Sequence, residues 1–223
     1  MKAFLRRPAA GIPDARAGSV TLQAVSVLLG YPDAALLERI PVVRAALTAV
    51  PPQAAEPLGR LCDHLESTAL EQLQLDYVET FDLRRRCSPF LTYFSHGDTR
   101  KRGMALLRFT HAYRSAGVVF EGDELPDHLA VVCEFAATGD LALGLRLLAE
   151  NRAAIELLHG ALDDMGSPYR ALLDAVRAVL PEPAPRDLEK ALELARTGPP
   201  EEEVGLQPFG PPELMGEEMG ARR

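Results

Sequence analysis

Apolar residues recur every three or four positions through most of the chain, which is the spacing of one buried face of an α-helix. The first such series contains Leu22, Val25 and Leu28, and Gly30-Tyr31-Pro32 stops it. No segment alternates apolar and polar residues for long, so strands find little support. We therefore predict an all-α fold, with a single-domain helical bundle over residues 19–180.

Start and stop signals predict several helix boundaries in the first half of this domain. Thr68 and Glu71 have the spacing of a capping box, in which each side chain satisfies a free backbone N–H group at the helix start. Asp98 or Thr99 is expected to cap a later helix. Gly117 suits the left-handed conformation that often ends a helix.

The region after Gly117 is predicted to hold three more core helices. Pro126 is expected in the first turn of one, where its missing N–H group costs nothing. A long helix is predicted from Leu141 to Leu162, because apolar residues repeat at helical spacing throughout. Ser167-Pro168 is expected to begin the last core helix.

Both ends of the chain are expected to lie outside the helical domain. Residues 1–18 are predicted to form a flexible tail. The Pro-rich run at 181–185 is predicted to be a stiff linker, followed by a short helix over residues 187–196. Beyond Gly198 the chain is rich in Pro, Gly and Glu and poor in residues that fill a core. Residues 181–223 are therefore predicted to form an acidic tail that is flexible apart from this helix.

Charge and cysteine content narrow the functional classes. The net charge of −8 argues against a protein that binds nucleic acid by neutralising phosphates. The three cysteines, at 62, 87 and 133, have no CxxC spacing and cannot all pair, which favours a reducing compartment. No apolar run approaches the roughly 20 residues that span a bilayer, so no membrane insertion is expected.

Two further functional classes have some support in the sequence. Glu156 and His159 have the Glu-x-x-His spacing of one half of a helical di-metal site, which allows a helical metal-dependent enzyme as an alternative. A partly exposed polar helix edge explains the same pair more simply. A generic helical scaffold or regulator, with a basic loop that contacts RNA, is the other alternative. Cys87 follows three arginines that could lower its pKa, but a buried structural thiol is the favoured interpretation.

The stretch from Tyr77 to Gly117 combines aromatic residues and cations in a way that favours peptide recognition. Its two basic runs, residues 84–86 and 100–102, flank a loop that contains Phe90, Tyr93 and Phe94. Aromatic faces beside cations suit an amphipathic peptide helix laid into a groove. A solvated surface patch, with cations near a helix end, is the alternative interpretation.

Asp127 and His128 form a second polar island at the start of a predicted helix. The negative charge of Asp127 in the first helical turn is expected to interact favourably with the helix dipole. That would be a structural role. If His128 takes part in peptide capture, its protonation should change affinity across the neutral pH range.

The stretch at 77–117 resembles the signature of the nitrate reductase molybdenum cofactor assembly chaperones, the NarJ type. The similarity is carried by YVETFDLRRRCS at 77–88 and by residues 92–108. LPDHL at 125–129, followed by Glu134-Phe135, is similar to the Pro-Asp-His motif of the wider TorD/DmsD group of redox enzyme maturation chaperones. The resemblance covers most of the predicted helical domain.

This resemblance implies a TorD-like, all-helical, cytoplasmic private chaperone and not an enzyme. Such proteins bind the N-terminal peptide of the catalytic, molybdenum-containing subunit of respiratory nitrate reductase. They hold that apo-subunit while the molybdenum cofactor is inserted and the complex is assembled. No cofactor bound permanently to the chaperone is implied.

The candidate peptide-binding residues share an aromatic, basic or Asp-His character and come from the two motif regions. They are Tyr77, Phe81, Arg84, Arg85, Arg86, Phe90, Tyr93, Phe94, Arg100, Asp127 and His128. Tyr77 and Phe81 are alternatively packing residues on the floor of the groove. The pattern is compatible with a monomer and with a dimer.

Overall fold

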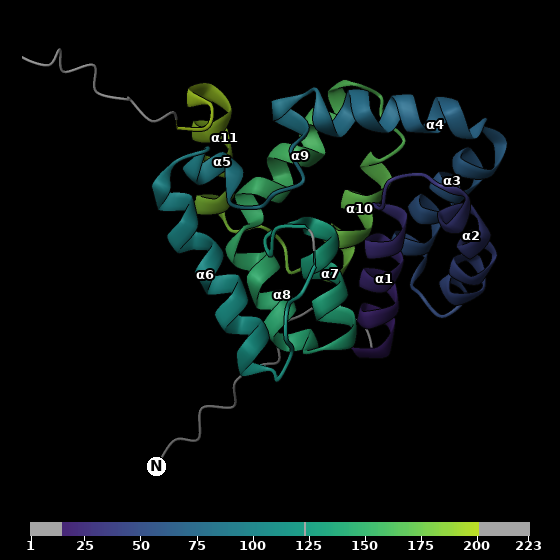
Figure 1. The fold of residues 1–223 in the computed structure, drawn as a ribbon, viewed down its shortest axis with the longest axis horizontal. Coiled ribbons are helices and arrows are strands. Elements are labelled where there is room, and N and C mark those ends of the chain that lie inside the picture. Colours follow the sequence, from purple (N-terminus) through teal and green to yellow (C-terminus); the bar gives the residue numbers. More distant parts are fainter. Residues whose placement is uncertain (1–14, 123, 201–223) are drawn as a thin grey trace, which may run out of the picture.

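A computed structural model describes residues 15–122 and 124–200, and it confirms the predicted all-α fold (Figure 1). Its helices, in chain order, are α1 (Ala15–Leu28), α2 (Ala34–Leu47), α3 (Pro52–Ser67), α4 (Leu70–Tyr77), the π-helical turn η1 (Val78–Asp82), the 3₁₀ turn η2 (Arg85–Cys87), α5 (Tyr93–His96), α6 (Arg100–Ser115), α7 (Leu129–Thr138), α8 (Leu141–Glu150), α9 (Arg152–Asp164), α10 (Arg170–Val179) and α11 (Pro185–Thr197). Among the described residues, β-type backbone pairing is limited to one isolated antiparallel bridge between Phe90 and His128.

Helix α1 lies in the centre of the bundle and packs against α7, α10 and α2 (Figure 1). Its Leu22 and Val25 are completely buried, as the periodicity predicted. Helix α10 packs against α3 on the other side, with Leu172 and Val176 also completely buried. The predicted apolar faces therefore meet in one continuous core, whose burial stabilises the domain.

Helices α7 and α8 pack unusually closely at a single glycine. A Cβ atom at Gly144 would lie 2.3 Å from Cβ and 2.5 Å from Cα of Ala136. Only a residue without a side chain fits there, so α8 approaches the backbone of α7 directly.

The single long helix predicted from Leu141 to Leu162 is wrong, because the chain breaks at Asn151 into α8 and α9. Asn151 leaves the helical conformation, with φ −104° and ψ 23°, and its side-chain amide donates to the carbonyl of Leu147 at 2.8 Å. The apolar repeat continues across the break, because both helices bury residues in the same core.

The predicted capping arrangements are only partly correct. The capping box is wrong, because α4 begins after Ala69, which has no side-chain cap, and Thr68 instead follows the end of α3. Thr99 does occupy the N-cap position of α6, but its hydroxyl donates back to the carbonyl of His96 at 2.7 Å. Gly117 has the predicted left-handed conformation, with φ +77°.

Most of the two predicted tails, at 1–14 and 201–223, lies outside the described residues. Within the described residues, α1 begins four residues before the predicted domain boundary at residue 19. The predicted short C-terminal helix corresponds to α11, which packs along α9 and buries Ala191. Among the described helices, none is both long and apolar enough to cross a bilayer.

Candidate peptide-binding site

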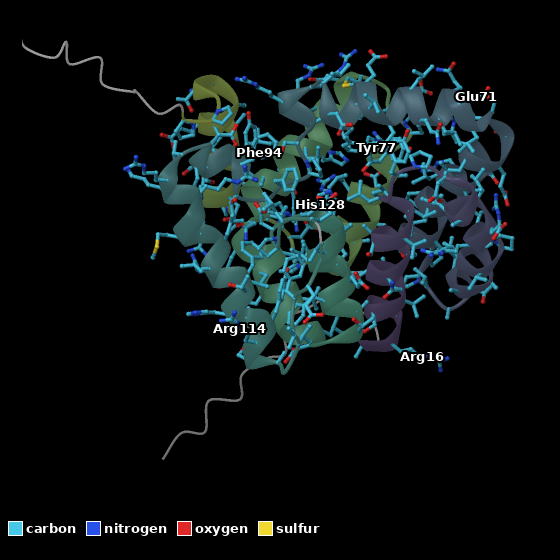
Figure 2. All side chains as sticks on the ribbon, viewed as in Figure 1. Arg16, Glu71, Tyr77, Phe94, Arg114 and His128 are labelled. Carbon is cyan, nitrogen blue, oxygen red and sulfur yellow. The ribbon has the colours of Figure 1, made fainter. Side chains whose placement is uncertain are left out.

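In the motif region at 77–117, residues 78–99 fold as a chain of short turns between the helices α4 and α6. The π-helical turn η1 extends α4, η2 follows it, and α5 leads into α6 (Figure 2). Short turns of this kind expose side chains in several directions, and π-helical turns are frequent at functional sites. Nine of the eleven candidate residues consequently separate into three groups in the structure, and Arg84 and Arg100 lie outside them.

Tyr77 and Phe81 form the first group, an internal aromatic cluster with Tyr169 of the α9–α10 connection. The ring of Phe81 lies 4.8 Å from that of Tyr77 and 5.1 Å from that of Tyr169, measured between centroids. The hydroxyl of Tyr77 donates to the carbonyl of Leu29 at 3.1 Å. Both candidate residues are buried, so they act as packing residues in this cluster and neither lines the cavity described below.

Asp127 belongs to a second group, in which it ties the turn before α5 to the start of α7. It is 0% exposed and precedes the helix, so the predicted position in the first helical turn is wrong. Its Oδ2 accepts hydrogen bonds from the backbone N–H of Thr92 at 3.0 Å and from the Thr92 hydroxyl at 2.6 Å. The Arg102 guanidinium lies 3.8 Å from the same oxygen. Asp127 therefore holds the loop from inside.

Arg102 connects this buried carboxylate to the aromatic loop. Its guanidinium carbon lies 5.3 Å from the ring centroid of Phe90 and 5.8 Å from that of Tyr93, which are cation–π distances. Its Nη1 donates to the exposed carboxylate of Asp98 at 3.0 Å. The second basic run thus contributes through Arg102, while Arg100 is exposed at the start of α6 and does not line the cavity described below.

His128 caps α7 and is also buried in this second group. Its Nδ1 accepts a hydrogen bond from the backbone N–H of Ala130 at 3.2 Å, and its ring lies 5.1 Å from that of Phe90. Pro126 consequently lies before the helix, not in its first turn, and its carbonyl accepts the hydroxyl of Tyr113 at 2.5 Å. Burial lowers the pKa of His128 below its ordinary value, against the opposing effect of Glu124 and Asp127.

The His128 cap predicts a pH-dependent stability. A lowered folded-state pKa means that the unfolded chain binds the proton more readily. This contribution to stability is complete above the ordinary value of 6.5 and is lost as pH falls through the folded-state pKa. Between about pH 7.5 and pH 5.5 we expect wild type to lose more unfolding free energy than His128→Asn, which caps without titrating.

Urea denaturation of both chains at each pH measures this difference. His96 also has a pKa lowered by burial, so only the difference between the two chains isolates His128. Equal losses in both would show that His128 does not contribute.

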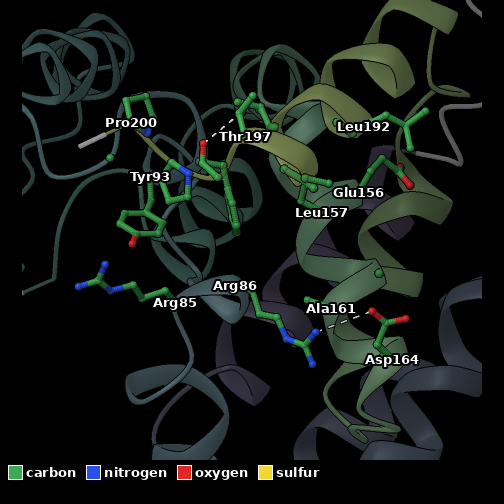
Figure 3. A pocket seen from close by; sticks show the side chains of 18 of the residues that line it. Arg85, Arg86, Tyr93, Glu156, Leu157, Ala161, Asp164, Leu192, Thr197 and Pro200 are labelled. Carbon is green, nitrogen blue, oxygen red and sulfur yellow. Dashed lines mark hydrogen bonds and ion pairs between the residues drawn. The ribbon is translucent and has the colours of Figure 1, made fainter. Parts of the chain in front are cut away.

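The third group lines a cavity of about 1440 Å³ between η2, α5, α9 and α11 (Figure 3). Arg85 and Arg86 are exposed at its edge, and Tyr93 and Phe94 contribute buried rings to its wall. Arg86 also lies 3.9 Å from the carboxylate of Asp164. The structure therefore brings two predicted cations and two predicted aromatic residues to one opening.

Arg84 lies apart from this opening. It pairs with Glu79 on η1 and lines a smaller pocket of about 400 Å³ with Arg86 and Tyr169. The eleven candidate residues are consequently not one continuous surface.

Several residues of the site were not singled out from the sequence. Thr92 and Arg102 were inside the motif, but only their contact with Asp127 distinguishes them from their neighbours. The wall formed by α9 and α11 was missed because it lies 60 or more positions further along the chain, and its residues read as ordinary helix. These wall residues include Leu157, Ala161, Leu188 and Leu192.

Glu156 and His159, the predicted half-site for a metal, lie in a network of ion pairs. Glu156 accepts from Arg152 at 2.6 Å and from Arg177 at 3.2 Å, and His159 lies 2.8 Å from Asp174. Guanidinium groups at these distances repel a metal cation. Across 15–122 and 124–200, no group of three or more His, Cys, Asp or Glu side chains is arranged to hold a metal. These contacts favour the interpretation that Glu156 and His159 are a polar pair at the edge of the helix.

Cys87 is buried, and its sulfur lies 3.4 Å from that of Met165. Burial raises the pKa of its thiol and outweighs the opposing effect of Arg86 and Arg84. A raised pKa disfavours the thiolate, so the structural role predicted for Cys87 fits its surroundings.

Comparison with known proteins places these features in a family. The model of the nitrate reductase delta subunit family matches residues 48–174. NarJ of Escherichia coli (strain K12), a nitrate reductase molybdenum cofactor assembly chaperone, is 32% identical over 158 residues, which are 70% of this chain and 67% of that protein. NarJ of Bacillus subtilis (strain 168) is 30% identical over 162 residues, which are 72% and 88% of the two chains.

A longer relative and a solved structure add to this comparison. The nitrate reductase-like protein NarX of Mycobacterium tuberculosis (strain H37Rv) is 40% identical over 157 residues. This match covers 70% of the chain but only 24% of NarX, so the chain spans about a quarter of that relative. A chain from Archaeoglobus fulgidus, assigned as a redox enzyme maturation protein, superposes with a TM-score of 0.52 and 22% identity. The superposition covers 79% of this chain and 97% of the Archaeoglobus chain, and it shows that the two chains have the same fold.

Proposed function

Since the chain belongs to the nitrate reductase delta subunit family, we propose that it is a cytoplasmic private chaperone for the apo catalytic subunit of respiratory nitrate reductase. In this proposal it binds the N-terminal peptide of that subunit as an amphipathic helix. It holds the subunit while the molybdenum cofactor is inserted and the complex is assembled. The chaperone itself catalyses no reaction and keeps no cofactor.

The observation that carries this proposal is the cavity beside η2 and α5. Its volume of about 1440 Å³ exceeds the range of about 300–1,000 Å³ that is usual for small-molecule sites. Its wall combines Tyr93 and Phe94 with exposed Arg85 and Arg86 at the edge. An aromatic wall with charges at its rim suits the apolar face of a helix whose polar side remains in water.

The groove residues have distinct expected contributions. The apolar lining of the cavity, to which Tyr93 and Phe94 contribute the exposed edges of their rings, supplies the apolar part of the binding free energy. The arginines at the edge steer the encounter and fix the register of the peptide. Asp127 and His128 are buried and hold the loop before α5 in place, whereas the buried Tyr77 and Phe81 pack with Tyr169 outside the lining of the cavity.

Calorimetry with a synthetic peptide of the client's N-terminus tests the proposal. The double variant Arg85→Ala/Arg86→Ala should weaken binding by about 5- to 30-fold, or about 1–2 kcal/mol. The effect should shrink at high salt, because exposed charges are screened.

Arg60→Ala/Arg114→Ala is the matched control, since both residues are exposed and lie outside the cavity. We expect it to bind like wild type. A wild-type chain with no measurable affinity for the peptide would reject the proposed function. An Arg85/Arg86 variant as tight as the control would reject the placement of the rim.

A further inference from the structure

The cavity has a second apolar wall, which is formed by α11. This helix packs along α9 through its buried residue Ala191, and Leu194 packs against the core. Leu188 and Leu192 lie on the same apolar stripe and line the cavity, but they remain 43% and 60% exposed. Half of the apolar stripe of α11 is therefore unpartnered, at the edge of an open space.

The facing side of the same space is also apolar. Figure 3 shows Tyr93 on one side of the pocket and Leu157 and Leu192 on the other, with Arg85 and Arg86 at its edge. An occupant of this space would thus meet apolar side chains from two directions. A helix whose apolar stripe is wide enough to contact both walls fits that lining. A helix with a narrow stripe would leave one of the two walls exposed to water.

The chain after α11 connects this wall to the opposite side of the cavity. It returns to the end of α5, where Gly97 has φ +55° and a Cβ atom would lie only 1.8 Å from the carbonyl oxygen of Pro200. The glycine permits that approach. Helix α11 thus packs along α9, and the chain beyond its end lies close to the end of α5, so both walls border one groove.

The size and charge of the groove identify the kind of occupant. If a helix is treated as a cylinder of about 10 Å diameter and 5.4 Å pitch, a space of this size takes roughly three turns. The rim carries exposed charges of both signs, with Asp98 in the turn between α5 and α6 and with Arg85 and Arg86 on η2. An amphipathic helix with charged residues of both signs beside its apolar stripe is complementary to this arrangement.

We propose that α11 is the second wall of the client-binding groove, and that Leu188 and Leu192 contact the apolar stripe of the client's N-terminal helix. This inference rests on the proposed function and extends it. It extends the binding surface beyond the motif regions at 77–117 and 125–129 into the C-terminal region, which the sequence predicts to be a tail. The functional unit then extends from α1 through α11.

The test measures binding of a fluorescein-labelled peptide of about 15 residues, or four helical turns, from the N-terminus of the nitrate reductase catalytic subunit of the same organism. Fluorescence anisotropy compares the full-length wild type with Leu188→Asp/Leu192→Asp. Two charges on this wall should weaken binding roughly tenfold or more and speed dissociation, because they meet an apolar stripe. Both leucines are largely exposed, so the melting temperature should stay close to that of wild type.

Val42→Asp/Leu75→Asp is the matched control. These residues are 70% and 66% exposed, lie on α2 and α4, and do not line the cavity. The control should bind like wild type. If the Leu188/Leu192 variant also binds like wild type, α11 is not a wall of the groove, although the proposed function stands.

Tighter binding by the Leu188/Leu192 variant would equally overturn this proposal, since it would show α11 to be a competitor of the peptide. Failure of the wild type to bind would reject the proposed function together with this inference. A peptide with a photoreactive residue on its apolar stripe gives a second readout. Cross-links to residues 188–195 support the wall, and cross-links confined to other elements contradict it.

Discussion

Asp127→Ala is expected to lower the free energy of unfolding by about 3–5 kcal/mol, the usual cost of removing one partner from a buried charged network. Asp127 is completely buried, and its carboxylate accepts two hydrogen bonds from Thr92. Without it, the Thr92 N–H and hydroxyl lose their acceptor. The nearby guanidinium of Arg102, whose side chain is only 13% exposed, loses a neighbouring negative charge.

Asp98→Ala is the matched control, because Asp98 pairs with the same arginine from a side chain that is 78% exposed. Exposed pairs contribute about 0–1 kcal/mol, so this variant should unfold almost like wild type. Urea denaturation of the two variants and wild type gives the comparison. Equal losses for Asp98→Ala and Asp127→Ala would show that burial does not decide the strength of this network.

The burial of Asp127 also affects how the peptide affinity of its variants should be interpreted. A loss of peptide affinity in Asp127→Ala would follow from a displaced loop, because this side chain does not reach the surface. Arg85 and Arg86 are exposed at the cavity edge, so their variants report on binding more directly. Asp127→Asn retains an oxygen acceptor for Thr92 and should lose less stability than Asp127→Ala.

Gly144→Ala is expected to destabilise the bundle by about 1–3 kcal/mol, which is the usual cost of overpacking. Alanine favours a helix by about 1 kcal/mol over glycine, so helix propensity alone predicts the opposite sign. Sterics should prevail, because the new Cβ would lie 2.3 Å from Cβ of Ala136. Helices α7 and α8 must then separate, and α7 also packs against α1 in the core.

Gly59→Ala is the control for this substitution. Gly59 lies inside α3, and a Cβ atom there would meet nothing within 4 Å. This variant should gain about 0.5–1 kcal/mol, because alanine reduces the freedom of the unfolded chain. Thermal unfolding followed by circular dichroism would show melting temperatures shifted in opposite directions. A stabilised Gly144→Ala chain would mean that α7 and α8 are not in close contact there.

The helical repeat of the sequence was sufficient for the fold class but not for every helix boundary. Leu22, Val25 and Leu172 are buried where the repeat placed them. The repeat could not show the break at Asn151, because α8 and α9 bury residues in the same core on both sides of it. A periodic pattern reports which side of a helix is covered, and it carries little information on where the axis changes direction.

Local signals were weaker guides than the repeat. Thr68 and Glu71 have the spacing of a capping box, yet α3 ends beside Thr68 and α4 starts without a side-chain cap. Caps contribute only about 1 kcal/mol, so packing of the flanking helices can override them. Pro126 is predicted inside a helix, but α7 begins only at Leu129, with His128 as its N-cap.

The order of residues along the chain was enough to establish the all-α fold, the family and the residue types of the motif. These depend on order along the chain, and the chain carries that order. The tertiary structure alone decided that Asp127 lies beneath the surface on Thr92, that Arg85 and Tyr93 share a cavity, and that α11 forms its other wall. Thr92 and Asp127 are 35 positions apart, and Leu188 of α11 is 95 positions from Tyr93. Such arrangements follow from how whole helices pack, which no local pattern encodes.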